Sequence, residues 1–268
     1  NKMKKKALLI LSYCIFGFYA CDDSSELPFG QNEYVIATPL TTDLFTFKQE
    51  AIDIVEPNEI VQSGKIYAYK DNIFINDVGR GIHVLDNTNP EAPQNIAFIK
   101  LEGNNDISIK NNRLYADSYG DLVIIDISDI NDIGDVKRLE NAIYQEFWCT
   151  VGFDVEWPQA DAYDYTELDA SSEAIVGWGT KKVRMSEKEF NEKYGHAFFE
   201  DSTLANSDAP TSDSGQGGSL ARFRIVGDYL YAVEWSSINV FDISDLDTPE
   251  ILDEVYTSGG IETIFNQG

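Results

Sequence analysis

Five carboxylates follow one another closely in the middle of the chain: Asp161, Asp164, Glu167, Asp169 and Glu173. Carboxylate oxygens are the ligands that Ca²⁺ prefers, so a segment of this kind could hold that ion. The spacing lacks the central glycine and the final bidentate glutamate of an EF-hand loop. We therefore predict no metal site and no cofactor, and keep Ca²⁺ binding by this segment as the alternative.

Few other residues are candidates for catalysis. The chain has two histidines, His83 and His196, which is too few for a histidine-rich metal site. The sequence contains no Gly-x-Ser-x-Gly nucleophile elbow, phosphate-binding loop, Cys-x-x-Cys pair or His-Glu-x-x-His zinc motif. We predict that no residue of this chain is catalytic.

The chain is strongly acidic, with 46 Asp and Glu residues against 20 Lys and Arg residues and a formal net charge of −26. A field of this sign repels nucleic acid, so we expect no nucleic-acid partner. Of the three cysteines, Cys14 and Cys21 lie near the N-terminus, and Cys149 has no second cysteine in the rest of the chain. No structural disulfide is expected there, and stability must come from a hydrophobic core.

The start of the chain has the pattern of an export signal. Lys4, Lys5 and Lys6 form a basic region, an apolar run extends from Ala7 to Phe18, and Ala20 is a small residue at the cleavage point. The apolar run is shorter than the roughly 20 residues that a transmembrane helix needs. Residues 1–20 are therefore predicted to be a signal peptide.

The pair Ala20-Cys21 resembles the lipobox of bacterial lipoproteins, in which the signal is cut before a cysteine that becomes the acylated N-terminus. The resemblance implies lipidation of Cys21 and a lipid anchor in the outer membrane of the cell envelope. Asp22 and Asp23 resemble the acidic signal that directs lipoproteins of the Bacteroidota to the cell surface. An ordinary acidic linker is the alternative reading of these two residues.

Three segments of the chain are similar to one another: residues 71–89, 112–131 and 228–247. The second and third match without a gap, so that Leu114 corresponds to Leu230. Each segment is typical of a β-hairpin, with a strand rich in β-branched and aromatic residues, a tight turn and a second, apolar strand. Because the second strands are apolar on both faces, we expect both faces to be buried.

An aspartate closes the second strand of each hairpin, at Asp86, Asp126 and Asp242. Each is followed by Asn-Thr or Ile-Ser, which is typical of an Asx-turn, so we interpret the three aspartates as structural. The first two are about 40 residues apart, a period that is typical of propeller blades with four short strands. The longer interval between the second and the third fits one such period plus an insertion.

The strands at residues 82–86, 122–126 and 238–242 resemble the LVIVD repeat of bacterial surface and secreted β-propellers. The resemblance implies an all-β fold built from propeller blades, and it says little about activity. Three repeats are fewer than the four to eight blades of a closed ring, so we expect a partial ring. Residues 262–268 correspond to the first strand of another repeat, which suggests an N-terminal fragment of a longer propeller.

We divide the chain into five parts. The signal peptide (1–20) is followed by a linker or N-terminal segment (21–59), propeller blades (60–144), an insertion (145–218) and a further, truncated blade (219–268). Within the insertion, Ser186 and Glu189 have the spacing of a capping box, which predicts a short helix that extends to Tyr194.

The insertion holds three of the four tryptophans of the chain: Trp148, Trp157 and Trp178. Rigid aromatic rings give a large contact area, and elements added to a repeat scaffold often carry binding sites. These three residues are therefore our candidate ligand-binding residues, and we expect at least one to line a surface groove against the blades. The alternative is that all three form the core of the insertion.

Together these features predict a cell-surface lipoprotein whose β-propeller is a binding or scaffolding module, with a protein or glycan partner and no catalysis. The alternative is an envelope hydrolase that acts on glycans or peptides with acidic residues at the propeller mouth. Hydrolysis of a glycan would require two carboxylates roughly 5 to 10 Å apart in a cleft. A structural envelope component without a ligand is a third possibility.

Overall fold

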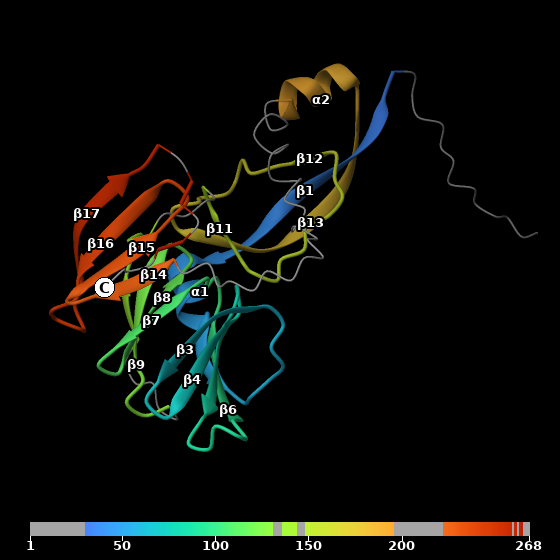
Figure 1. Cartoon of the computed structure of the whole chain (residues 1–268). Helices are drawn as coiled ribbons and strands as arrows, with labels where there is room; N and C mark the ends of the chain where they lie inside the picture. Colours follow the sequence, from blue (N-terminus) through green and yellow to red (C-terminus); the bar gives the residue numbers. More distant parts are fainter. Residues whose placement is uncertain are drawn as a thin grey trace, which may run out of the picture.

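The computed structural model describes residues 30–130, 136–143, 148–195, 222–258, 260–261 and 263–264. The predicted signal peptide, Cys21 and His196 lie outside these residues. The described residues are mostly β-strand with two short helices, which confirms the all-β class (Figure 1).

Three sheets are antiparallel meanders, in which neighbouring strands follow one another along the chain. The first contains β3 (Ser63–Tyr69), β4 (Asn72–Asp77), β5 (Gly81–Asp86) and β6 (Gln94–Leu101), with β2 (Ile52–Val55) beside β6. The second contains β7 (Ile107–Lys110), β8 (Arg113–Ser118), β9 (Asp121–Asp126) and β10 (Lys137–Leu139). The third contains β14 (Phe223–Val226), β15 (Tyr229–Val233), β16 (Ser237–Asp242) and β17 (Glu250–Tyr256).

The strand pairing confirms the predicted alignment of the second and third repeats. Leu114 on β8 pairs with Ile125 on β9, and the corresponding Leu230 on β15 pairs with Phe241 on β16. The strands that begin the three meanders lie next to each other, since β7 contacts both β3 and β14. The long insertion between β10 and β14 therefore does not separate the second sheet from the third.

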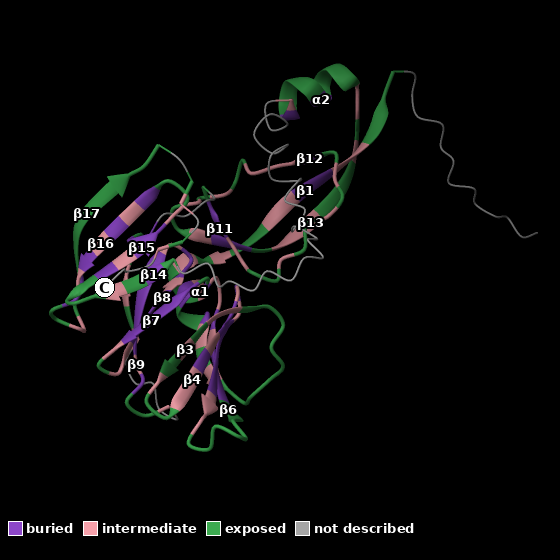
Figure 2. Ribbon diagram, viewed as in Figure 1, coloured by how far each residue is buried: buried purple, intermediate pink, exposed green. Residues whose placement is uncertain are grey.

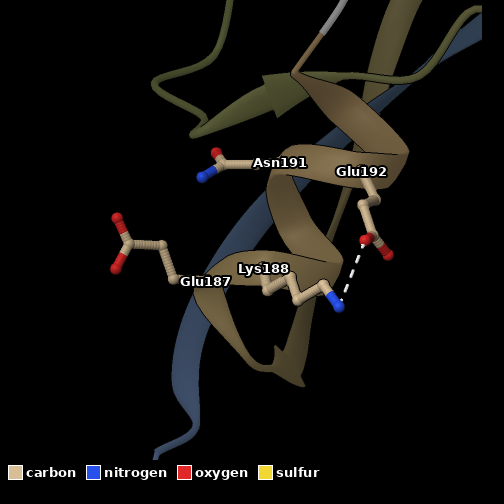
Figure 3. Close-up of a pocket in the computed structure, with 4 residues that line it drawn as sticks. All are labelled: Glu187, Lys188, Asn191 and Glu192. Atoms are coloured by element: carbon tan, nitrogen blue, oxygen red, sulfur yellow. Dashed lines mark ion pairs between the residues drawn. The ribbon is translucent and has the colours of Figure 1, made fainter.

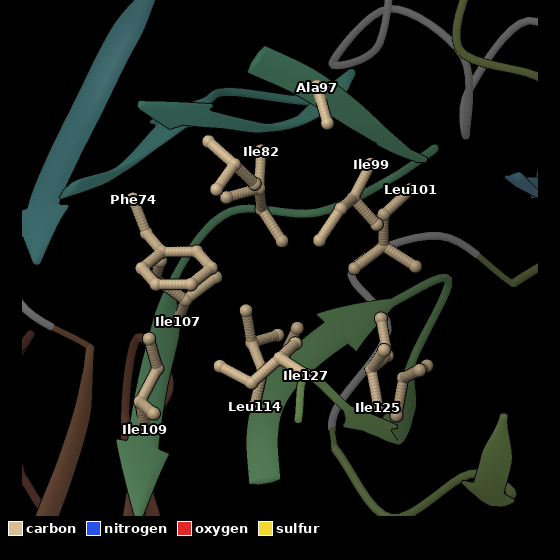
Figure 4. Close-up of a cluster of buried hydrophobic side chains, with 13 residues drawn as sticks. Phe74, Ile82, Ala97, Ile99, Leu101, Ile107, Ile109, Leu114, Ile125 and Ile127 are labelled. Atoms are coloured by element: carbon tan, nitrogen blue, oxygen red, sulfur yellow. The ribbon is translucent and has the colours of Figure 1, made fainter. Parts of the chain in front are cut away.

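Apolar side chains fill the space between the first and second sheets. Figure 4 shows Phe74, Ile82 and Ile99 of the first sheet facing Leu114 and Ile125 of the second. All five side chains are almost completely buried. A second cluster joins the second sheet to the third through residues that include Tyr115, Leu122, Phe223, Leu230 and Phe241.

The expectation that all three second strands are buried on both faces is wrong for β16. Every residue from Asp121 to Ile125 on β9 is buried, whereas buried and half-buried residues alternate along β16. Phe241 packs against the second sheet, while Val240 is half-buried. Among the described residues no further sheet covers this outer face, and β17 is exposed along its whole length (Figure 2).

A fourth sheet joins the N-terminal segment to the insertion. β1 (Asn32–Asp43) forms within the segment expected to be a linker, and it pairs in antiparallel fashion with β13 (Glu173–Met185) along its whole length. β12 (Ala162–Tyr163) is parallel to β1, and β11 (Thr150–Val151) is parallel to β13. Figure 1 shows β1 and β13 extending away from the three meanders.

Two helices flank this fourth sheet. α1 (Leu44–Glu50) follows β1 directly, and the Asp43 carboxylate caps it by accepting from the Thr46 amide. α2 (Glu187–Tyr194) lies at the far end of the β1–β13 pair (Figure 1). Ser186 and Glu189 form the predicted capping box, with the Glu189 carboxylate accepting from the Ser186 amide at 2.8 Å.

Candidate functional site

The insertion lies against the hairpin turns of the first two sheets. The Phe153 amide donates to the Tyr119 hydroxyl at 3.1 Å, in the turn between β8 and β9. The Phe153 ring also covers Gly79 in the turn between β4 and β5, where a Cβ would lie 1.9 Å from the ring. Gly79 has a φ of +77°, so both the backbone conformation and this contact favour glycine.

The three tryptophans of the insertion belong to one aromatic cluster, which we define as Trp148, Tyr165, Trp178, Trp157 and Tyr163. Trp148 meets Tyr165 edge-on with ring centroids 5.3 Å apart, and Tyr165 meets Trp178 at 5.7 Å. Trp178 lies 4.7 Å from Trp157 and 5.2 Å from Tyr163. Contacts of this geometry stabilise aromatic pairs beyond the area that they bury.

The tryptophans differ in their exposure to solvent. Trp148 is 58% exposed and Trp157 is 42% exposed, while Trp178 is half-buried between them. The insertion therefore does not enclose all three rings, and two indoles remain accessible to a ligand.

A cavity of about 530 Å³ opens beside Trp148. It lies between α1, the chain after β10, the start of β11 and the turn that precedes β13. Its lining residues are Asp43, Leu44, Phe45, Lys48, Gln49, Arg138, Glu140, Asn141, Trp148, Cys149, Thr150, Ala170, Ser171 and Ser172. The cavity thus joins the insertion to the second sheet.

A buried group of charges holds these elements together beside the cavity. The Lys48 ammonium of α1 and the Arg138 guanidinium of β10 donate to opposite oxygens of the Asp121 carboxylate, at 2.7 and 2.9 Å. The Arg138 guanidinium also donates to the Lys48 carbonyl at 2.8 Å. Because removing one partner of a buried ion pair leaves an uncompensated charge, these contacts fix α1 against β9 and β10.

Polar groups at the mouth of the cavity are held by local hydrogen bonds. The hydrogen bond from the Thr46 hydroxyl lowers the pKa of Asp43 below its ordinary value. The Ser171 and Ser172 hydroxyls donate to the Asp169 carboxylate at 2.6 and 2.8 Å. These contacts fix the mouth of the cavity before any ligand arrives.

Four of the five carboxylates considered as a Ca²⁺ site, those of Asp161, Asp164, Asp169 and Glu173, accept hydrogen bonds from protein donors. Asp161 accepts from the Val35 amide at 2.6 Å, and Glu173 accepts from the Thr41 hydroxyl at 2.9 Å. Within the part of the chain that the structure describes, no three His, Cys, Asp or Glu side chains are grouped so that they could hold a metal ion.

Further ionisable groups of the interior do not line the cavity. The Asp106 carboxylate is 1% exposed, and burial raises its pKa. It accepts from the amides of Arg222 and Phe223 at 2.5 and 2.7 Å. His83 is fully buried, with Nε2 lying 3.2 Å from an Asp77 carboxylate oxygen.

A second depression, of about 590 Å³, lies on α2 (Figure 3). Its four lining residues, Glu187, Lys188, Asn191 and Glu192, all come from this one helix. Lys188 and Glu192 form an exposed ion pair at 3.7 Å across one helical turn. A single helix surface cannot surround a ligand, so the cavity beside Trp148 is the stronger candidate site.

Sequence reasoning did not identify the cavity residues of α1 and of the second sheet. Phe45 and Lys48 lie in a segment expected to be a linker or N-terminal segment, and Arg138 follows a predicted strand without forming part of a motif. A cation that is buried against another sheet leaves no signal in its own sequence neighbourhood.

Known protein-family models and curated protein sequences contain no match to this chain. Over the ranges that the structure describes, neither helix is long and apolar enough to cross a membrane.

Proposed function

We propose that this chain is a cell-surface lipoprotein in which LVIVD-like propeller blades carry a binding site at the cavity beside Trp148. The signal-like N-terminus and Cys21 support the lipid anchor. The scaffold is a binding module, and its ligand is recognised by the insertion together with α1.

The arrangement of the meanders supports the propeller. Each contains four consecutive antiparallel strands, with β2 added at the edge of the first, and the strands β3, β7 and β14 that begin the meanders lie side by side. Contacts at the ends of these strands repeat from sheet to sheet. The Tyr69 hydroxyl donates to Asn112 in the next hairpin turn, and the Lys110 ammonium donates to Asp228 in the turn after that. This repetition supports the interpretation of the three meanders as successive propeller blades.

The exposure of Trp148 at the mouth of the cavity is the observation that carries this proposal. An indole that is 58% exposed beside a cavity offers apolar surface that a ligand can cover. The buried Lys48, Asp121 and Arg138 charges keep the cavity preformed, which lowers the cost of ordering it on binding.

The test compares two tryptophan variants of the full chain. Trp148→Ala removes the wall of the cavity, and Trp235→Ala is the matched control, because Trp235 is 74% exposed and lies on the turn between β15 and β16. A panel of oligosaccharides and secreted proteins is screened by surface plasmon resonance. We expect a ligand that the wild type and Trp235→Ala bind and Trp148→Ala does not. Equal binding of all panel members by Trp148→Ala would exclude this cavity as the site.

A further inference from the structure

We propose that the ligand is a neutral, extended oligosaccharide that has one end in the cavity beside Trp148 and reaches Trp157 along the aromatic cluster. This inference rests on the proposed binding function and specifies the chemical class of the ligand.

The lining of the cavity is better suited to bind a sugar than to bind the surface of another protein. The centre of a protein interface is depleted of charged residues, whereas this cavity combines charged, amide and hydroxyl side chains. Sugar hydroxyls both donate and accept hydrogen bonds, so they match a mixed set such as Gln49, Glu140 and Asn141. The two exposed aromatic residues of the lining, Phe45 and Trp148, can cover the C–H faces of a sugar ring.

The charge of the site favours a neutral ligand. The accessible charges at the mouth include Asp43 and Glu140, and the two cations beside the cavity already share the Asp121 carboxylate. The net charge of −26 also opposes the approach of a polyanion. A glycan that carries many carboxylates or sulfates would therefore bind weakly.

The aromatic cluster extends the site beyond the cavity. Trp178 on β13 and Tyr163 on β12 contact each other, so they share one face of the fourth sheet. Trp157 and Tyr165 pack on these two rings, and Trp148 continues the cluster from Tyr165 to the cavity. Two exposed indoles, Trp148 and Trp157, are thus joined by packed rings, and a chain of sugars can cover both.

The test measures affinity as a function of sugar-chain length. Cello-, manno- and xylo-oligosaccharides from the monosaccharide to the hexasaccharide are titrated calorimetrically into the full chain. We expect the affinity of one series to rise at least about tenfold with length, because the second contact becomes intramolecular. Trp157→Ala should remove this gain and leave the binding of the shortest ligand unchanged. Trp148→Ala should weaken the binding of every member of the series, and Trp235→Ala should not change the binding of any member.

Absence of measurable binding in all three series would overturn the oligosaccharide class. The extended site would be overturned if the affinity did not depend on the length of the sugar chain. It would also be overturned if Trp157→Ala lowered the affinity for all lengths equally. Either result would leave the proposed function intact. Stronger binding of polygalacturonate than of every neutral series would overturn the neutral class. A protein ligand that is lost in Trp148→Ala would overturn the glycan and support the proposed function.

Discussion

The Lys65 ammonium lies 3.3 Å from the Asp106 carboxylate at the point where the three meanders meet. Lys65 and Asp106 occupy corresponding places in two repeats. Lys65 directly precedes Ile66, which pairs with Ile75 on β4, and Asp106 directly precedes Ile107, which pairs with Ala116 on β8. Lys65 also donates to the Phe223 carbonyl at 2.6 Å, which brings β14 into the same junction. One cation and one anion therefore tie three repeats together.

Asp106→Ala should destabilise the protein by about 3 to 5 kcal/mol, because it leaves the Lys65 charge and three backbone amides without their buried partner. The free energy of unfolding in urea measures this loss. Asp228→Ala is the control, since Asp228 forms an exposed pair with Lys110 that should contribute about 1 kcal/mol or less. Similar losses for the two variants would show that the junction is not a major source of stability.

Truncation of side chains in the repeats should cost more stability at positions covered by a neighbouring sheet than on the uncovered outer face of β16. Leu114→Ala and Leu230→Ala, at fully buried positions, should each cost about 2 to 5 kcal/mol through cavity formation. Ile124→Ala, at 3% exposure, should fall in the same range of about 2 to 5 kcal/mol. Val240→Ala should cost less, because this side chain is only half-buried. Equilibrium unfolding of all four variants checks the order, and a loss at Val240 as large as that at Leu230 would contradict it.

Protonation of the Asx-turn aspartates should destabilise the protein in acid. Hydrogen bonds from Thr88 and Ser244 hold the pKa of Asp86 and of Asp242 below its usual range. Because these pKa values are lower in the folded state, their contribution to stability is present above about pH 4 and is lost as the pH falls through the folded values.

The double substitution Asp86→Asn and Asp242→Asn keeps the accepting oxygen but removes the titration. Urea midpoints measured from about pH 5 down to about pH 2 should fall less steeply for this variant than for the wild type. Burial raises the pKa of Asp106, so the titration of this group changes the stability with pH in the opposite direction. The wild type and the variant share this contribution, so the difference between their profiles reports on Asp86 and Asp242. Identical pH profiles would rule out this role of the two aspartates.

Cys21→Ala should abolish lipidation, since Cys21 is the cysteine that follows the predicted cleavage point. Metabolic labelling with palmitate and partitioning into a detergent phase measure the anchor. Binding to the ligand identified in the panel should persist in this variant, because the cavity lies elsewhere in the chain. Unchanged membrane partitioning would refute the lipoprotein assignment.

The parts of the fold that were predicted from the sequence are local. The hairpins of β8–β9 and β15–β16 follow from apolar strands and tight turns, and α2 follows from the capping box of Ser186 and Glu189. The predicted Asx-turns are also present, with the Asp126 carboxylate accepting from the Ser128 amide at 2.8 Å. In each case the deciding contacts lie within a few residues of one another.

The parts that were missed depend on partners far away in the chain. β1 contains Thr and Pro residues and has no clear alternation, so nothing in its own sequence indicates that it pairs with β13. The outer face of β16 is as apolar as the buried faces of β9, and only the arrangement of whole sheets determines its exposure. The cavity has the same origin, because its walls come from four separate segments.

The pairing of β1 with β13 also determines the order in which the protein can fold. Glu33 and Arg184, which form an ion pair at 3.3 Å across these strands, are 151 residues apart in the chain. The meanders need only contacts between successive strands, and such local contacts form faster than pairings that close a long loop. β1 precedes both of its partners in the chain, and its long antiparallel partner β13 follows only after the first two meanders. Because Tyr163 and Trp178 of the aromatic cluster lie on β12 and β13, we expect the cluster to form later than the hairpins of the first two meanders.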